Sequence, residues 1–113
     1  MRDDRERLRD INEAIEKIEK YVSIGYQAFA EDERTQVWII HHLQVIGEAS
    51  NHLSDELTEQ KPDIPWIDIF GLRNILVHQY FGIDLRQVWE TAELDMPILK
   101  AGVREILQEI NDK

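Results

Sequence analysis

Hydrophobic residues recur along the chain in steps of three and four, the spacing that places side chains on one face of an α-helix. Residues 2–30 carry a single apolar stripe, which predicts one long amphipathic helix. We expect the charged residues between the stripe positions to form a solvated face, and Gly25 to mark a close approach of another helix. The stripe comprises Leu8, Ile11, Ile15, Ile18, Val22, Gly25 and Phe29.

A second helix is predicted from about Thr35 to a point between Leu53 and Leu57. Asp32 lies in the polar break before it and is a suitable N-cap, because its carboxylate can accept the free N–H groups of the first turn. The helix has two adjacent apolar rows, and so wide a hydrophobic face is typical of an inner helix of a bundle.

The central helix is predicted over residues 65–82. Pro62 and Pro65 favour an extended connection before it. Pro65 also suits the first helical turn, and Gly82 suits the C-terminal stop. The apolar residues surround the helix axis, so we expect burial on several sides. These residues are Trp66, Ile67, Ile69, Phe70, Leu72, Ile75, Leu76 and Val77.

The last helix is predicted over residues 84–110, with Asp84 and Gln87 in a capping-box arrangement. Its apolar register continues through Pro97, which indicates a kink or two helices nearly end to end. The chain has no strand-like alternation and no internal repeat. These patterns predict an all-α protein, an up-and-down bundle of four or five helices that forms a single domain over residues 1–113.

The composition limits the cellular compartment and the kinds of binding partner that we expect. The 113 residues include no cysteine, which excludes disulfides and cysteine metal sites and fits a reducing cytoplasm. The N-terminus lacks the apolar core of a signal peptide, and no apolar run approaches a membrane span. We therefore expect a cytoplasmic protein with no membrane partner. The net charge of −10 repels nucleic acid, so any RNA chemistry must depend on a local cluster.

Four polar residues interrupt the apolar surface of the central helix: Arg73, Asn74, His78 and Tyr80. A buried charge or imidazole needs a partner or a function. On a helix, Asn74 and His78 share a face, and Arg73 and Tyr80 nearly share another. An arginine to hold a phosphate, a histidine to move a proton and an amide to orient them would be a sufficient set for cutting RNA.

The same residues resemble a known family. The Arg-Asn…His-x-Tyr run is similar to the signature of HEPN-domain proteins, and its flanks resemble the HepT-like toxins. The matching stretches are Ile64-Pro65-Trp66, Gly71-Leu72-Arg73-Asn74, His78-Gln79-Tyr80-Phe81-Gly82, Val88-Trp89 and Ile46-Gly47-Glu48-Ala49. The resemblance covers roughly Leu8 to Ile110. It implies a homodimeric, metal-independent endoribonuclease without a cofactor, which cleaves RNA as the toxin of a toxin–antitoxin pair.

From the residues alone, each side chain keeps two interpretations. His78 is a general acid or base for the ribose 2′-hydroxyl, or a buried histidine bonded to a backbone carbonyl. Arg73 stabilises charge on a phosphate, or pairs with a carboxylate such as Glu48. Asn74 orients His78, or is a surface amide. The resemblance favours catalysis by His78, with Arg73 on the phosphate and Asn74 in support.

Helix geometry adds an argument for two copies of the chain. Arg73 and His78 would lie about 140° apart around one helix, which is awkward for one compact site. Two central helices packed about a two-fold axis would place both pairs around a single cleft. We expect a homodimer from this apolar central helix and, independently, from the resemblance.

Tyr80 has a role only through the resemblance, which implies that it accepts AMP from a partner nucleotidyltransferase, the antitoxin. The added bulk and negative charge would occupy the place of an RNA phosphate. Otherwise Tyr80 is equally well a tyrosine with its ring in the core and its hydroxyl at the rim. The chain is not the transferase itself, because none of its five glycines precedes a serine, as the Gly-Ser loop of that class requires.

Glu48 is a weaker candidate, one turn before His52 and two turns after His41. It is either an acid that lines the cleft or an ordinary helix carboxylate. Together with His42, these histidines lack the spacing of a zinc motif, so we expect no metal.

Two other functions stay open. One is a non-catalytic subunit that binds nucleotide or substrate for a nucleotidyltransferase and uses the same residues only to hold phosphate. The other is a purely structural helical dimer, which would leave the polar cluster of the central helix unexplained.

Overall fold

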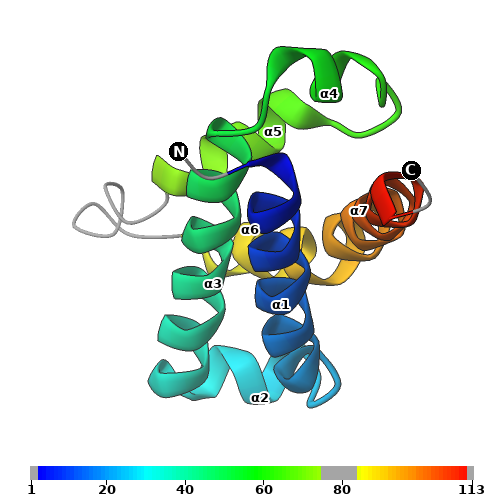
Figure 1. The fold of residues 1–113 in the computed structure, drawn as a ribbon. Coiled ribbons are helices and arrows are strands. Elements are labelled where there is room, and N and C mark those ends of the chain that lie inside the picture. Colours follow the sequence, from blue (N-terminus) through cyan, green and yellow to red (C-terminus); the bar gives the residue numbers. More distant parts are fainter. Residues whose placement is uncertain (1–2, 75–83, 112–113) are drawn as a thin grey trace.

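The computed structural model describes residues 3–74 and 84–111, and every regular element in these ranges is helical (Figure 1). The predicted all-α helical bundle is therefore confirmed. The elements are α1 (Asp4–Val22), α2 (Tyr26–Glu31), α3 (Glu33–Asn51), α4 (Asp55–Glu59), α5 (Trp66–Phe70), α6 (Leu85–Glu90), η2 (Thr91–Asp95, a turn of π-helix) and α7 (Met96–Asn111).

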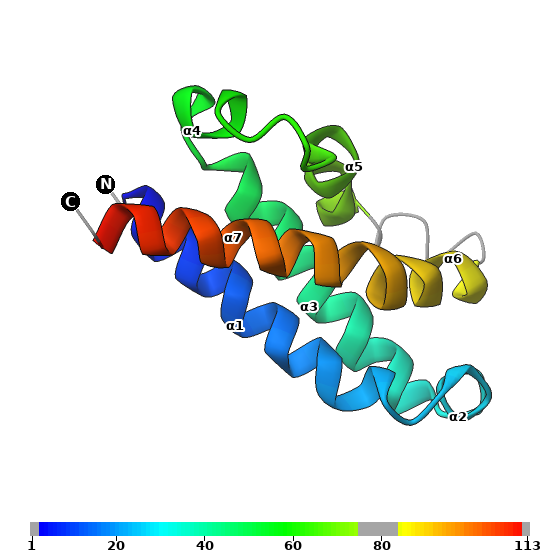
Figure 2. The same ribbon diagram turned by 90° about the vertical axis from the view of Figure 1, so that its right-hand side faces the viewer.

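The two longest helices, α1 and α3, run antiparallel side by side, and α2 connects them at one end of the molecule (Figure 1). α7 lies across α1, and α6 continues its line beside α3 (Figure 2). The apolar stripe of α1 faces this core as predicted. Its residues Leu8, Ile11, Ile15 and Ile18 are completely buried, and they contact a core that includes Phe29, Ile39, Leu43, Ile46, Met96, Leu99 and Val103.

Gly25 breaks the first helix, so the prediction of one helix over residues 2–30 is wrong. Its φ of +93° lies in the region that only glycine adopts without strain, and it separates α1 from α2. A Cβ placed on Gly25 would meet no atom within 4 Å, so the expected close approach is also wrong. The glycine serves the turn, and the stripe continues across the break because α2 returns Phe29 to the core.

Asp32 caps α3 as predicted. Its carboxylate accepts hydrogen bonds from the backbone N–H of Arg34 and the hydroxyl of Thr35, both at 3.0 Å. The Thr35 hydroxyl, with the backbone N–H groups and the Arg34 charge, lowers the pKa of Asp32. α3 ends at Asn51, slightly before the predicted stop, because Ser54 caps a separate short helix, α4. The backbone N–H and the hydroxyl of Ser54 in turn donate hydrogen bonds to the Asp4 carboxylate.

Pro97 divides the last helix, as predicted, into two helices nearly end to end. Asp84 caps α6 by accepting from the backbone N–H groups of Arg86 and Gln87 at 3.1 and 3.2 Å. Proline has no N–H to continue an α-helical ladder, and its ring would crowd the carbonyl four residues earlier. The wider π-helical turn η2 lies just before it, with the Met96 N–H bonded to the Thr91 carbonyl.

The central segment differs from its prediction. α5 ends at Phe70, and residues 71–74 form a tighter 3₁₀ turn, so a continuous α-helix from residue 65 is wrong at this point. Residues 75–82 of the predicted helix lie outside the described residues. Burial of the described part of this segment is uneven in the single chain: Trp66, Ile69 and Leu72 are buried, whereas Ile67 is 86% exposed.

Gly47 is the reason that the 71–74 turn lies where it does. A Cβ on Gly47 would overlap the backbone nitrogen of Arg73 and lie 2.9 Å from the carbonyl carbon of Leu72. On either side of Gly47, two α3 amides donate hydrogen bonds to this segment. Gln44 Nε2 binds the Arg73 carbonyl at 3.2 Å, and Asn51 Nδ2 binds the Phe70 carbonyl at 3.0 Å. We call these three α3 residues, Gln44, Gly47 and Asn51, the backbone clamp.

We predict that Gly47→Ala lowers the free energy of unfolding by about 1–3 kcal/mol, because the new methyl group pushes the 71–74 backbone away from α3. Urea unfolding followed by circular dichroism measures the change. Gly71→Ala is the matched control: Gly71 has helical φ, and a Cβ there meets nothing within 4 Å. It should leave stability unchanged or raise it slightly. Equal stability of the two variants would refute the close approach at Gly47.

Candidate functional site

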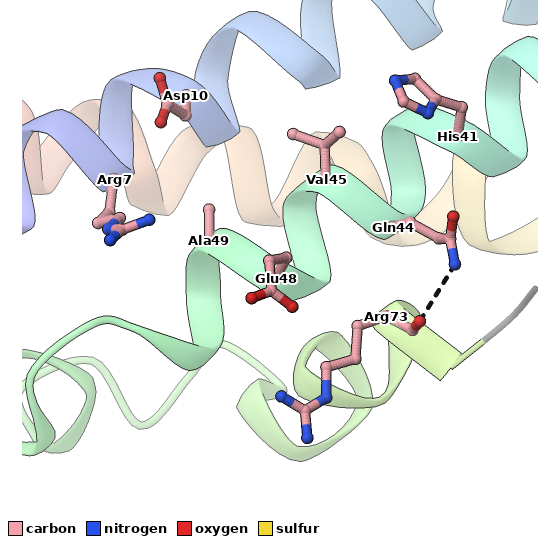
Figure 3. Close-up of a pocket in the computed structure, with 8 residues that line it drawn as sticks. All are labelled: Arg7, Asp10, His41, Gln44, Val45, Glu48, Ala49 and Arg73. Atoms are coloured by element: carbon pink, nitrogen blue, oxygen red, sulfur yellow. Dashed lines mark hydrogen bonds between the residues drawn. The ribbon is translucent and has the colours of Figure 1, made fainter.

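A pocket of about 410 Å³ opens between α1, α3 and the 71–74 turn (Figure 3). We call it the Arg73 pocket. α1 contributes two residues, α3 contributes five, and the turn contributes Arg73. The lining residues are Arg7, Asp10, His41, Gln44, Val45, Glu48, Ala49 and Arg73.

Arg73 reaches this pocket because the backbone clamp fixes its main chain. Gln44, itself a lining residue, holds the Arg73 carbonyl, while the exposed guanidinium extends from the turn below Glu48 (Figure 3). The Arg73 side chain has no hydrogen bond or ion pair with any residue that the structure describes. The guanidinium is therefore available to a ligand, and an anionic group such as a phosphate suits its donors best.

Glu48 does not form the ion pair with Arg73 that was the structural alternative for the arginine. Its carboxylate oxygen instead lies 3.1 Å from Nε2 of His52, one helical turn away. Glu48 does line the Arg73 pocket, on the same face of α3 as His41. Asn74 is exposed and is not among the lining residues. The structure thus brings Arg73 and Glu48 together, but not Asn74 with them.

Arg7 and Asp10 belong to the pocket although they were expected on a solvated face. Both are half-buried, on the side of α1 that packs against α3. Arg7 precedes the buried Leu8 and Asp10 precedes the buried Ile11, so each lies at the edge of the apolar stripe. Adjacency to stripe positions was the signal that could have indicated partial burial. It could not indicate the pocket that they share with Arg73.

The charges in the pocket balance locally. Among the lining residues that the structure describes, Arg7 and Arg73 contribute two positive charges and Asp10 and Glu48 two negative ones, which sum to zero. The whole chain carries a net charge of −10. The pocket is therefore much less repulsive to an anion than the protein as a whole, which is the local condition that RNA chemistry requires here.

His41 connects the Arg73 pocket to two further hollows along α3. One, of about 380 Å³, is lined by Glu33, Arg34, Val37, Trp38 and His41. The other, of about 220 Å³, is lined by Asp10, Glu13, Ala14, Lys17, His41, His42 and Val45. His42 is buried against Trp38, with ring centroids 4.6 Å apart, and its Nε2 has no hydrogen-bond partner. Burial, with the nearby His41 and Lys17, lowers the pKa of His42.

Metal and membrane binding can be tested only on the described part of the chain. Within residues 3–74 and 84–111, no three His, Asp or Glu side chains are grouped to hold a metal ion. No helix in the same ranges is both long and apolar enough to cross a bilayer. His78 and Tyr80 lie outside the described residues, so their predicted roles, and the predicted face shared by Asn74 and His78, stay predictions.

Comparisons with known proteins identify the family. The model of the family "Ribonuclease HepT-like" matches residues 11–106. The chain is 40% identical to a probable ribonuclease HepT of Thermococcus cleftensis, over 88% of this chain and 91% of that protein. It is 36% identical to a candidate RNase of Methanocaldococcus jannaschii, over 85% and 89% of the two chains. A candidate RNase of Caldanaerobacter subterraneus is 37% identical, over 80% and 81%. No solved structure gives a significant match.

The matched range includes α3 with its backbone clamp, the 71–74 turn that carries Arg73, and α6 to most of α7. The resemblance seen in the Arg-Asn…His-x-Tyr residues and their flanks is therefore confirmed. The chain belongs to the HepT-like family of ribonucleases.

Proposed function

We propose that this protein is a metal-independent endoribonuclease in which Arg73 binds the phosphate at the cleaved bond and His78 transfers the proton. The main support for the proposal is the Arg73 guanidinium. It forms no ion pair with a described residue, and it lines a pocket whose described charged side chains sum to zero. Membership of the ribonuclease family supports the reaction class. Asn74 is assigned the supporting role of orienting His78, and Glu48 lines the cleft.

The chemistry is an internal transesterification of RNA. The ribose 2′-oxygen attacks the adjacent phosphorus, and neutral His78 accepts the proton that this hydroxyl loses. The bond from phosphorus to the 5′-oxygen of the next nucleotide breaks, leaving a 2′,3′-cyclic phosphate. The departing 5′-oxygen takes a proton, which a second, protonated His78 in a dimer would supply. Arg73 stabilises the additional negative charge on the phosphoryl oxygens.

The proposed active form is a homodimer. Ile67 supports it, because this large apolar side chain of α5 is 86% exposed four residues before the 71–74 turn. Isolated apolar residues are common on surfaces, but one this exposed beside the site suits an interface with a second copy. Such an interface would bring two copies of Arg73 and His78 around one cleft.

Regulation is proposed to follow the toxin–antitoxin pattern. A partner nucleotidyltransferase transfers AMP to the hydroxyl of Tyr80, with loss of pyrophosphate from ATP. Tyr80 is seven residues after Arg73 in the sequence. The adenylate would add a phosphate charge and a nucleoside beside the position of the RNA phosphate, so it would repel and sterically exclude the substrate.

A second candidate function uses the same pocket without cleavage. In it, the protein is a non-catalytic subunit that holds nucleotide or substrate phosphate for a nucleotidyltransferase. The Arg73 guanidinium serves this role equally well. The two functions differ in His78, which only the nuclease needs for proton transfer.

We predict that purified protein cleaves single-stranded RNA in EDTA and that His78→Ala lowers the rate by roughly 10²–10⁴-fold, the usual contribution of general acid–base catalysis. Arg73→Gln should lower it roughly 10²-fold or more, because it removes charge stabilisation in the transition state. Arg9→Gln is the control, since Arg9 is an exposed α1 residue outside the pocket. RNA binding without cleavage by wild-type protein, shown by mass to lack AMP, would support the binding-subunit function instead.

For Tyr80, we predict that Tyr80→Phe retains RNA cleavage and resists inhibition. Incubated with a nucleotidyltransferase partner and ATP, the wild-type protein should gain the mass of one adenylate per chain and lose activity. The variant should gain no mass, because phenylalanine offers no hydroxyl. Intact-mass spectrometry and the RNA cleavage assay measure both. Adenylation of Tyr80→Phe at another residue, with loss of activity, would contradict the assignment.

For the dimer, we predict that Ile67→Lys shifts the protein to monomers, because a charge in the interface must be desolvated. Sedimentation velocity measures the shift. Ile24→Lys is the matched control: Ile24 is 45% exposed in the α1–α2 connection, at the opposite end of the molecule from α5 (Figure 1). The control should remain dimeric. A dimer in both variants would exclude Ile67 from the interface.

A further inference from the structure

Arg7 is the second guanidinium of the Arg73 pocket, and it comes from a different element. It is a half-buried residue near the start of α1. Its side chain extends from the side of that helix that faces Ala49 and Glu48 (Figure 3). Arg73 enters the same pocket from the 71–74 turn. Two arginines far apart in the sequence thus line one pocket of about 410 Å³.

The hydrogen bonding of Arg7 is incomplete. Its Nε is buried from solvent and has no hydrogen-bond partner among the described residues. The guanidinium also forms no ion pair with a described residue, whereas Arg34, Arg86 and Arg104 each lie within 4 Å of a carboxylate, at 3.8, 3.7 and 3.9 Å. A buried N–H without an acceptor is unfavourable and rare in folded proteins. Because Arg7 lines the pocket, an anionic ligand there can supply acceptors to its guanidinium.

The charge balance of the pocket indicates the chemistry of that ligand. Arg7 and Arg73 together offset Asp10 and Glu48. Without Arg7, the described lining residues would present a single cation, Arg73, in a protein whose net charge is −10. Arg7 therefore adds a second cation for an anion beside the one that Arg73 would hold. Guanidinium groups bind phosphate oxygens through paired N–H donors.

We propose that Arg7 is a second phosphate-binding residue, which holds a backbone phosphate of the RNA next to the phosphate at the cleaved bond. The assignment rests on the proposed nuclease function, since it takes single-stranded RNA as the ligand. Arg7 binds and positions the strand, and it takes no part in proton transfer. Because it contacts the backbone, it contributes affinity without base preference.

The test measures binding of a fluorescent single-stranded RNA to His78→Ala protein over a series of salt concentrations. Adding Arg7→Gln to this parent should weaken binding roughly tenfold, the effect of losing one charge-assisted hydrogen bond. It should also reduce the slope of log K against log salt by about 0.7, the value for one phosphate contact with a single strand. The loss should be the same for oligonucleotides of unrelated sequence.

Arg9→Gln is the matched control, because it removes the same charge from the exposed side of α1 two residues away. It should match the parent in affinity and slope, and Arg7→Lys should restore the slope but only part of the affinity. In cleavage-competent protein, Arg7→Gln should raise KM with little change in kcat, as expected for a contact made equally in the ground and transition states.

The inference is overturned if Arg7→Gln and Arg9→Gln bind RNA with the same affinity and slope while the parent binds and the wild type cleaves. It is also overturned if Arg7→Gln lowers only the free energy of unfolding, since Arg7 would then be structural. Failure of the parent to bind RNA, together with failure of the wild type to cleave it, would instead refute the proposed function, and the role of Arg7 with it.

Discussion

The contact between the 71–74 turn and α3 is the constraint on which the site depends. Two backbones meet there because Gly47 has no side chain, and Gln44 and Asn51 hold the incoming segment by its carbonyl groups. These hydrogen bonds satisfy backbone carbonyl groups at the end of α5 and in the turn that follows it. They also fix the main chain of Arg73 without using its side chain. The guanidinium therefore stays available, while the main chain that carries it is held against α3.

Local charge balance would allow an acidic protein to bind an anion such as an RNA phosphate. Outside the pocket, Lys61, Lys100 and Arg104 pair with glutamates of α1 and α7. In the Arg73 pocket, two arginines offset two carboxylates. Screening by salt weakens the distant repulsion more than the short contacts inside a pocket. Binding of RNA would thus depend on a few short-range contacts, and a general positive field would not assist it.

The sequence predicted the helical elements well wherever the signal was local. The caps at Asp32 and Asp84 are confirmed because capping needs only a side chain within three residues of the first turn. The division of the last helix at Pro97 is confirmed because proline lacks the N–H wherever it stands. Gly25 was assigned wrongly for the opposite reason: a glycine in a stripe fits both a close approach and a left-handed turn, and only φ distinguishes them. The early end of α5 was missed because it arises from contact with α3.

The candidate site also has features that the sequence indicates and features that depend on tertiary contacts. The sequence by itself supplied the proposed site residues Arg73, Asn74 and His78 and indicated the family to which the chain belongs, because motif spacing is a property of the chain. Only the tertiary structure decided that Arg73 has no ion pair with Glu48, and that Arg7 and Asp10 join the pocket from α1. Helix periodicity gives the face on which a residue lies, but which element covers that face depends on how distant segments pack. Here that packing depends on the bare backbone at Gly47.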